Sequence, residues 1–387
     1  MKFINTVELR PGLIFSTPVY TEGENLLIPA MVPLRQKDID FLLAWGIDFI
    51  NIEGDIIEAE EMPKPEEIPV VSPSKKGTIR FSISDVRQNS GPYRAYKNLI
   101  EKLNSVFTNL KSGADVEMRQ VDSICALLLQ DLRDHPDSFI DYILGGEITT
   151  NELAKSSVNA AILSALTAQE LKLPNHKILK IVAGALLHDV GMLRLSKGIT
   201  EKKGGLSEAE LDQIKSHPMH TSKIVTKELF GPHEVNLIAL QHHERWDGKG
   251  YPDKLTGNAI DIGARILSVA DAFEAMVSKK SYRNSMLGYQ AVKNLLADNA
   301  RRFDPAVIIA FTKIMGIYPI GSIVRLNNDS IARVVKIHPD APIRPVIQLL
   351  MDENGNIPDS RNIESIDLLT KKGLFIKEAI DPSEFSK

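Results

Sequence analysis

The sequence predicts a mainly α-helical protein with a small β-rich unit at each end. From about residue 92 to residue 316, apolar residues recur at intervals of three and four, and no alternating strand pattern interrupts them. Short β-branched runs separated by turn residues occur before residue 54 and again after residue 318. A chain of 387 residues is long enough to hold several such units.

The N-terminal unit is predicted to span residues 1–54. Apolar or β-branched runs at 13–20, 26–32 and 47–52 are separated by turn residues, so they predict strands. Residues 34–45 carry apolar positions at a helical spacing between two of these runs. The pattern therefore predicts a compact β-rich regulatory or adaptor domain with one helix.

The remaining boundaries follow changes in composition. Residues 55–90 mix glutamates with prolines and carry too little apolar surface for a core, which predicts a linker. The helical pattern begins with a lead-in over 91–144 and continues through 145–316. In 317–387, two β-branched runs flank the turn-forming sequence at 327–330 and predict a hairpin, followed by two further strands.

Composition argues against several classes of partner. The net charge of −4 and a pI near 6.2 show no overall basic bias, so a nucleic-acid polymer is not expected as a partner. The single cysteine, Cys125, has apolar neighbours, so it is expected to be a buried structural thiol in a reducing compartment. No apolar run reaches 18 residues and the N-terminus lacks a signal-peptide pattern, so a cytoplasmic protein without a membrane span is expected.

The stretch His242 to Pro252, HHERWDGKGYP, carries the strongest chemical signal. Two adjacent histidines stand at a predicted helix end, and the glycines and the proline that follow prevent further helix. A histidine pair is costly to bury, whereas Gly250 allows the backbone to approach a ligand closely. The stretch therefore predicts a metal or phosphate site.

Other ligand types lie elsewhere in the helical region. His188 and Asp189 close an apolar helical run, His217 precedes a proline near the start of another helix, and Asp271 lies on a helix face of small residues. Alone, His188-Asp189 would be a helix cap and Asp271 a solvated carboxylate. Beside the histidine pair at 242 and 243, all are predicted to be ligands. His220, His233 and His338 are assigned no role.

Together these residues supply four imidazoles and two carboxylates, more than one tetrahedral ion needs. The set fits two divalent transition-metal ions bridged by Asp189 and a water, an arrangement that predicts phosphoester hydrolysis. The predicted ligands are His188, Asp189, His217, His242, His243 and Asp271.

Over roughly 145–316 the chain resembles the HD-GYP family, a branch of the HD-domain phosphohydrolases that hydrolyses the bacterial second messenger cyclic di-GMP. The matching stretches are ALLHDVG at 185–191, HP at 217–218, HHERWDGKGYP at 242–252, ILSVADAFEAM at 266–276 and KKSYR at 279–283. The resemblance implies an HD-domain helical bundle that carries the site. The N-terminal β-rich unit resembles the regulatory domain that often precedes this bundle, and the C-terminal β-rich unit resembles the family's usual C-terminal extension.

The resemblance also implies roles for individual residues. It implies that the six predicted ligands bind two metal ions, that these are iron or manganese, and that Asp189 bridges them. Asp189 and Arg283 would be catalytic, and Arg283 would also bind a substrate phosphate. Tyr251 and Gly250 would shape the substrate pocket. The family's usual metal-binding histidine is replaced by Ser156, which makes Ser156 and Glu152, one helical turn earlier, auxiliary candidates.

A second departure is Met192, which stands where the family has a lysine, and Arg194 or Lys197 would be the stand-in cation. Two functions therefore stay open. The first is a phosphodiesterase that hydrolyses cyclic di-GMP to pGpG or GMP, with activity weakened by Ser156 and Met192. The second is a catalytically degenerate module that senses cyclic dinucleotides or binds a protein. Hydrolysis of another phosphoester is a third reading, and a homodimer or a signalling-protein partner is left open.

Overall fold

The structure is a computed structural model that describes residues 91–144, 152–278, 286–298, 301–357 and 365–381 apart from single positions, together with 2–17 and shorter pieces up to residue 57. The chain divides into two compact units. One unit comprises 1–83, 287–297 and 315–387, and the other comprises 84–286 and 298–314. Most of the predicted linker at 55–90, and Arg283 with the KKSYR stretch, lie outside the described residues.

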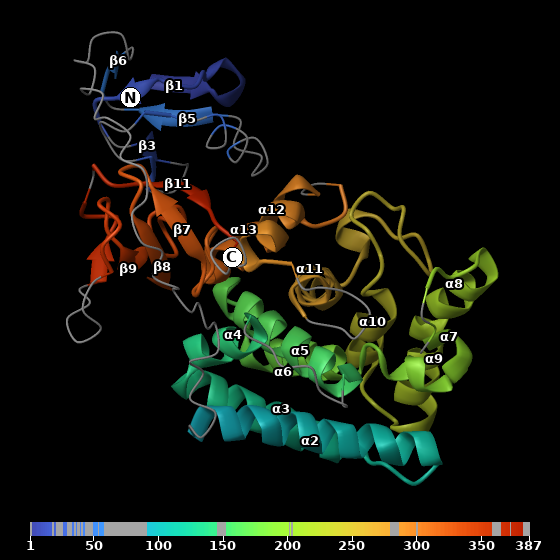
Figure 1. The fold of residues 1–387 in the computed structure, drawn as a ribbon. Coiled ribbons are helices and arrows are strands. Elements are labelled where there is room, and N and C mark those ends of the chain that lie inside the picture. The colour runs from blue at the N-terminus through green and yellow to red at the C-terminus, as the bar shows by residue number, and fades with distance from the viewer. Residues whose placement is uncertain are drawn as a thin grey trace. The chain divides into compact units, whose positions relative to one another are not determined.

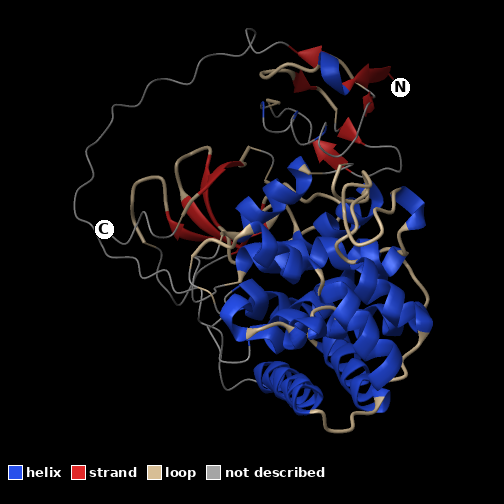
Figure 2. Cartoon of the chain, turned by 90° about the vertical axis from the view of Figure 1, so that its right-hand side faces the viewer, coloured by secondary structure: helices blue, strands red, loops and turns tan. Residues whose placement is uncertain are grey.

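The second unit is helical and contains every described residue predicted to bind metal (Figures 1 and 2). This confirms the predicted mainly α fold. Short 3-10 turns at Val190–Arg194 (η3) and Gly257–Ala259 (η5) and a π-helical turn at Ile224–Glu228 (η4) join or extend the helices. The α-helices are α2 (Gly91–Ser112), α3 (Met118–Asp134), α4 (Pro136–Leu144), α5 (Glu152–Glu170), α6 (Asn175–Leu187), α7 (Lys197–Thr200), α8 (Glu208–Lys215), α9 (His217–Lys223), α10 (His233–Gln241), α11 (Ile262–Val277) and α13 (Pro305–Met315).

Helix α5 lies at the centre of the helical unit. Nearly every residue from Ala154 to Ala168 is buried, whichever way it faces, as expected for a helix enclosed by others. Helices α2, α6 and α11 pack against it, and Figure 1 shows α2 and α3 along one side of the α5–α6 pair. Helix α11 also approaches α10 closely because it has a glycine there: a Cβ at Gly263 of α11 would lie 2.7 Å from the Ile238 side chain of α10.

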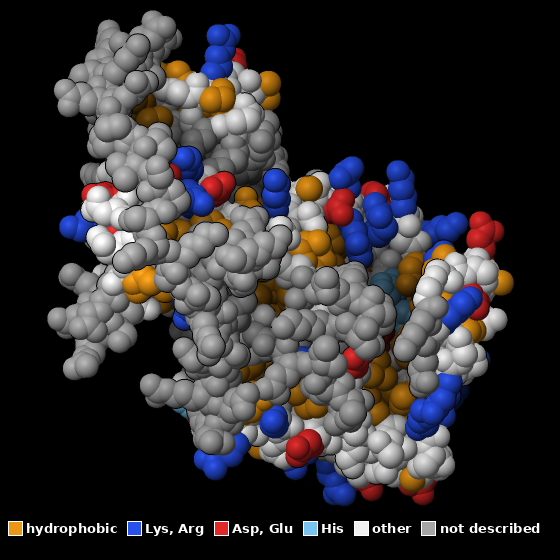
Figure 3. Space-filling view, in the orientation of Figure 1, with side chains coloured by type: hydrophobic (Ala, Val, Ile, Leu, Met, Phe, Trp, Pro, Cys, Tyr) orange, Lys and Arg blue, Asp and Glu red, His pale blue; other side chains and the backbone are white. Residues whose placement is uncertain are grey.

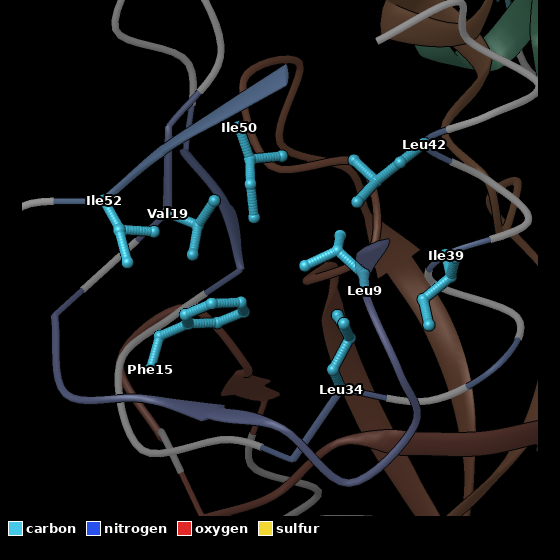
Figure 4. Close-up of a cluster of buried hydrophobic side chains, with 8 residues drawn as sticks. All are labelled: Leu9, Phe15, Val19, Leu34, Ile39, Leu42, Ile50 and Ile52. Carbon is cyan, nitrogen blue, oxygen red and sulfur yellow. The ribbon is translucent and has the colours of Figure 1, made fainter. Parts of the chain in front are cut away.

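The N-terminal part of the first unit contains short antiparallel strands. A four-stranded sheet has the order β1 (Lys2–Asn5), β5 (Phe49–Ile52), β3 (Val19–Tyr20) and β4 (Leu26–Ile28), and β2 (Ile14–Phe15) pairs with β6 (Ile56–Ile57). Phe15, Val19 and Ile50 of these strands belong to one buried apolar cluster (Figure 4). Strand β1 was not predicted, because four residues are too few to show a period. The predicted helix at 34–45 falls largely outside the described residues.

The C-terminal part of the first unit is a five-stranded antiparallel sheet. The strands are ordered β10 (Ser365–Asp367), β9 (Val346–Met351), β8 (Ile331–Lys336), β7 (Ile323–Leu326) and β11 (Ile376–Ala379). The predicted hairpin is confirmed, because β7 pairs with β8 across a turn in which Asp329 has a φ of +65°. Strand β11 was not predicted. Helix α12 (Gly288–Ala297) belongs to this unit, where Tyr289 stacks on Tyr318 with ring centroids 5.1 Å apart.

Two further observations concern burial and length. Cys125 is buried in α3, as predicted, and burial raises the pKa of its thiol. None of the described helices combines the length and the apolar character that crossing a bilayer requires.

Candidate metal centre

Three of the predicted ligands lie where helices end. His188 follows α6 directly, His242 follows α10 directly, and His217 is the second residue after α8. The ring Nδ1 of each lies 2.7 Å from the backbone oxygen three residues earlier, those of Ala185, Ala239 and Ile214. Helix C-termini carry partial negative charge, so the ends of α6 and α10 favour a cation here, whereas His217 also begins α9, whose N-terminus carries partial positive charge.

These contacts also fix which ring nitrogen faces the centre. A carbonyl oxygen only accepts, so each Nδ1 carries the hydrogen and donates it. The lone pair of each neutral ring is therefore on Nε2, which is the form that binds a metal. His188 Nε2 is buried without a hydrogen-bond partner among the described residues. A buried ring nitrogen without a partner fits a cation at the centre, which would take the place of a proton there.

Asp189 lies between the imidazoles. Its Oδ1 is 3.1 Å from His217 Nε2 and 3.9 Å from His242 Nε2, whereas its Oδ2 is 3.4 Å from His188 Nε2. Candidate ligand atoms of Asp189, His217, His242 and His243 all lie within 4.8 Å of one another. The two oxygens of one carboxylate thus face different histidines, as a bridging ligand would require.

Asp271 and His243 complete the cluster from two other directions. Asp271 Oδ1 on α11 lies 3.6 Å from His188 Nε2, and the His243 ring lies 4.0 Å from that of His242. The structure therefore brings all six predicted ligands together, although their role as ligands stays a prediction. Figure 3 shows histidine side chains among those at the surface of the drawn face.

The electrostatics favour the protonation states that metal binding needs at most of these groups. Burial lowers the pKa of His243 to about 4, and burial with neighbouring imidazoles lowers the pKa of His242 well below its ordinary value. Burial opposes ionisation of Asp189, but His188 and His217 outweigh it and hold the pKa well below the usual range. Burial likewise disfavours a charge on His188, yet the carboxylates of Asp189 and Asp271 raise its pKa to about 9. A cation would have to displace that proton.

Two glycines permit the close packing around the cluster. A Cβ on Gly191, just after Asp189, would lie 2.2 Å from the backbone oxygen of His217, so η3 could not approach α9 with any side chain there. A Cβ on Gly250 would lie 2.4 to 2.6 Å from backbone atoms of His243, Glu244 and Arg245. Both positions therefore require glycine for steric reasons.

Glu244 and Asp247 hold the loop that follows the histidine pair. Glu244 is 2% exposed, and its carboxylate accepts hydrogen bonds from the backbone nitrogens of Asp253 (2.6 Å) and Leu255 (3.1 Å). Asp247 accepts from the Arg245 guanidinium at 2.8 and 3.0 Å, which lowers the pKa of Asp247 to about 2. The loop is consequently held by its own acidic residues.

Tyr251 reaches the cluster through His243. Its backbone nitrogen donates to the His243 oxygen at 3.2 Å, and the two rings stack with centroids 4.8 Å apart and planes at 29°. Burial raises the pKa of the Tyr251 phenol, so the hydroxyl stays protonated at neutral pH. Tyr251 therefore presents a hydrogen-bond donor beside the histidines, and its role in a substrate pocket stays a prediction.

Family models match both the helical region and the tail. Residues 147–307 match the HD domain, and residues 323–387 match a KOW domain associated with the HD domain. The chain is HD-GYP-like.

Named relatives agree with this result. The cyclic di-GMP phosphodiesterase PdeB of Borreliella burgdorferi is 28% identical over 94% of this chain and 92% of its own length. A cyclic di-GMP phosphodiesterase of Pseudomonas aeruginosa is 26% identical over 92% of this chain and 87% of its own length. The cyclic di-GMP phosphodiesterase response regulator RpfG of Xanthomonas campestris is 36% identical over 39% of this chain and 40% of its own length.

The residues that depart from the family pattern in this HD domain have defined surroundings. Ser156 Oγ donates to Glu274 Oε2 at 2.5 Å, and Met192 is half-buried in η3. Glu152 is half-buried one turn before Ser156, and among the described contacts none joins it to the histidine cluster. Metal binding by Glu152 or Ser156 stays a prediction.

The proposed stand-in cation Arg194 is already engaged. Its guanidinium donates to both carboxylate oxygens of Glu228 at 2.8 and 2.6 Å and to the Leu110 backbone oxygen at 3.3 Å. These contacts hold Arg194 between η4 and α2, which does not support a role for it at a substrate phosphate. Lys197 is exposed.

A further segment at the site was not predicted. The Trp246 nitrogen donates to the Arg302 oxygen at 3.0 Å, and the Asp247 nitrogen donates to the Arg301 oxygen at 2.9 Å, so residues 301–302 brace the loop. The Arg265 guanidinium lies over the Trp246 ring at 5.7 Å and pairs with Asp304 at 2.7 Å. No periodicity in the sequence signals such a pairing, because it joins loops rather than regular elements.

Proposed function

We propose that this chain is a metal-dependent phosphodiesterase that hydrolyses cyclic di-GMP. The observation that carries the proposal is the convergence of His188, His217 and His242, with Nε2 directed inward, on the carboxylate of Asp189. The relatives that share almost the whole length of the chain are named for this activity. Substrate and reaction are inferred from both observations together.

The donor set fits two divalent transition-metal ions, for which iron and manganese are the favoured choices. Asp189 would contact both, since its two oxygens face different histidines. The other residues of the set are His188, His217, His242, His243 and Asp271. Such a pair of ions supplies an activated water and neutralises the non-bridging phosphate oxygens.

The chain's own residues orient and shield the reaction. Tyr251 fixes the His243 ring by stacking, and its protonated phenol is placed to donate a hydrogen bond to a phosphate oxygen. The buried histidines exclude bulk water from one side of the centre. Arg283 is proposed to bind a phosphate, and it lies outside the described residues.

In this hydrolysis, water oxygen forms a bond to phosphorus while the bond from phosphorus to the ribose oxygen breaks. The ribose oxygen leaves with a proton, so cyclic di-GMP gives linear pGpG, and a second cycle gives GMP.

The test uses the full chain purified without oxygen, with metal content and cyclic di-GMP hydrolysis measured on the same preparation. Bound transition metal and release of pGpG or GMP are expected. Substitution of both His242 and His243 by alanine should abolish both. His233→Ala is the matched control, because His233 opens α10 at the surface and should change neither. Metal-loaded protein that leaves cyclic di-GMP intact would refute the proposal.

One observation favours a second function, a cyclic-dinucleotide sensor without turnover. Ser156 stands where the family pattern has a histidine and donates to Glu274, so the centre has one imidazole fewer than that pattern. Binding of cyclic di-GMP at full metal loading, with no product after prolonged incubation, would select the sensor. Self-association and a signalling partner stay predictions, which sedimentation analysis with and without cyclic di-GMP would test.

A further inference from the structure

A buried carboxylate lies one helical turn beyond Asp271. Glu274 of α11 is 1% exposed and is not one of the six predicted ligands. Its Oε2 accepts from Ser156 Oγ at 2.5 Å, and its Oε1 accepts from Ser278 Oγ at 2.5 Å and from Asn159 Nδ2 at 3.2 Å. These bonds tie α11 to α5 beside the metal centre.

The network continues into a helix that precedes the HD domain. Tyr96 of α2 is 4% exposed, and its hydroxyl donates to Asn159 Oδ1 at 2.7 Å. Burial raises the pKa of this phenol and the nearby Glu274 charge raises it further, so the hydroxyl remains a donor. The family match begins only at residue 147, so Tyr96 supports the network from outside the matched region.

The groups that donate hydrogen bonds to Glu274 are neutral. Its three donors are two hydroxyls and one amide, and none of the ion pairs found among the described residues includes Glu274. Burial of an ionised carboxylate is costly unless hydrogen bonds or an opposite charge stabilise it. Residues three apart share one face of a helix, so Glu274 adds negative charge on the side of α11 that carries Asp271.

The same bonds restrict the position of Asp271. Helix α11 carries Asp271, and His188 Nε2 lies 3.6 Å from the Asp271 carboxylate. Apolar packing alone tolerates small rotations of a helix, whereas a buried and fully bonded carboxylate specifies one register. Groups that bond directly to a metal ligand typically contribute 10- to 100-fold to metal affinity, and Glu274, which acts through the position of α11, is expected to contribute at the lower end of that range.

We infer that Glu274 is a positioning residue for the metal centre, that Tyr96 and Asn159 complete its support, and that Ser156 serves it as a hydrogen-bond donor. This inference rests on the metal centre of the proposed function. A purely structural role is the competing explanation, and it predicts loss of stability without loss of metal affinity.

The test measures Mn²⁺ binding to the full chain by calorimetry and by the electron paramagnetic resonance signal of free Mn²⁺. Glu274→Gln keeps the shape and removes the charge, and the hydroxyls of Ser156 and Ser278 can rotate to serve the new amide. Its Mn²⁺ affinity is expected to fall about 10-fold, the lower end of the range for groups that bond directly to a ligand. Tyr96→Phe removes one distant donor and should reduce the affinity in the same direction by a smaller factor.

The chain offers matched controls for both variants. Ser157→Ala removes a buried hydroxyl next to Ser156 that has no hydrogen-bond partner among the described residues. Tyr93→Phe removes the hydroxyl of a buried tyrosine one turn before Tyr96. The Tyr93 ring packs against that of Tyr142, with ring centroids 5.2 Å apart. Both controls should bind Mn²⁺ as the unmodified chain does.

The outcomes separate the two proposals. Loss of affinity in Glu274→Gln and Tyr96→Phe, with both controls unchanged, supports the inference. Unchanged affinity in these two variants, even with a lower melting temperature, overturns it and leaves the proposed function standing. Failure of the unmodified chain to bind Mn²⁺ would refute the metal centre of the proposed function and the inference with it.

Discussion

Substitution of Gly250 by alanine tests whether the loop after the histidine pair determines activity. The added Cβ would lie 2.4 Å from the Arg245 nitrogen, 2.5 Å from the Glu244 Cα and 2.6 Å from the His243 oxygen. All three are backbone atoms, so no flexible side chain can move aside. Overpacking of this kind costs about 1–3 kcal/mol of folding stability.

The effect on activity should exceed the effect on stability. To restore ordinary contacts the loop must shift by about 1 Å, and Tyr251 is the next residue, so its ring would move relative to His243. A misplacement of about 1 Å near a reacting group costs roughly 100-fold in rate. We expect kcat/KM for cyclic di-GMP to fall by about this factor while bound metal is retained, because the three contacts are with backbone atoms and none is with a histidine ring.

The measurement compares kcat/KM, metal content and melting temperature of Gly250→Ala with those of Gly205→Ala. No atom lies within 4 Å of a Cβ placed on Gly205, so that variant should behave as the unmodified chain in all three. If Gly250→Ala kept full kcat/KM, the loop would not position the substrate, and the steric reasoning would be refuted.

Three further predictions concern groups around the centre and at the surface. Ser156→Ala should leave the number of bound metal ions unchanged, because Ser156 donates to Glu274; elemental analysis that shows a lost ion would contradict this. Arg194→Ala should change kcat/KM less than about 3-fold and stability by less than about 1 kcal/mol, because Arg194 forms a partly exposed ion pair with Glu228, and steady-state kinetics with thermal melting checks both. Contacts with Lys202 and with the Ser207 backbone lower the pKa of Glu210 from 4.5 to about 2. The stabilisation of α8 by the Glu210 carboxylate should therefore be complete above pH 4.5 and decrease as the pH falls toward 2. Amide exchange over residues 208–215 measures this pH dependence.

The sequence predicted the helical unit and the position of its chemistry because both depend on local patterns. Burial on one side of a helix repeats every three to four residues, and the histidines stand where those patterns stop. His188 and His242 each end an apolar run, and the structure has each one directly after its helix. Residues of these types at helix ends are visible in sequence without knowledge of the packing.

The supporting contacts were not predictable in the same way. Tyr96 and Asn159 are separated by 63 residues, and Asn159 and Glu274 by 115, so their hydrogen bonds depend on how α2, α5 and α11 pack. The pairing of Trp246 with Arg302 joins two irregular segments. The hydrophobic pattern of α12 showed a helix but did not show which core it joins, and the structure has it with the β-rich unit.

The common placement of three histidines explains how one centre arises from distant segments. The Nδ1 hydrogen of each points to the carbonyl oxygen three residues earlier, a bond that the last helical turn offers to any histidine there. This hydrogen bond within the helix end thus sets both the tautomer and the direction of each ring. When the ends of α6, α8 and α10 lie close together, the Nε2 atoms of His188, His217 and His242 therefore point to one place. Because α6 and α10 also contribute partial negative charge at the ends that His188 and His242 cap, the geometry that orients these two rings favours a cation beside them. Moving one of these histidines a single residue along its helix should therefore abolish metal binding even where the imidazole is kept.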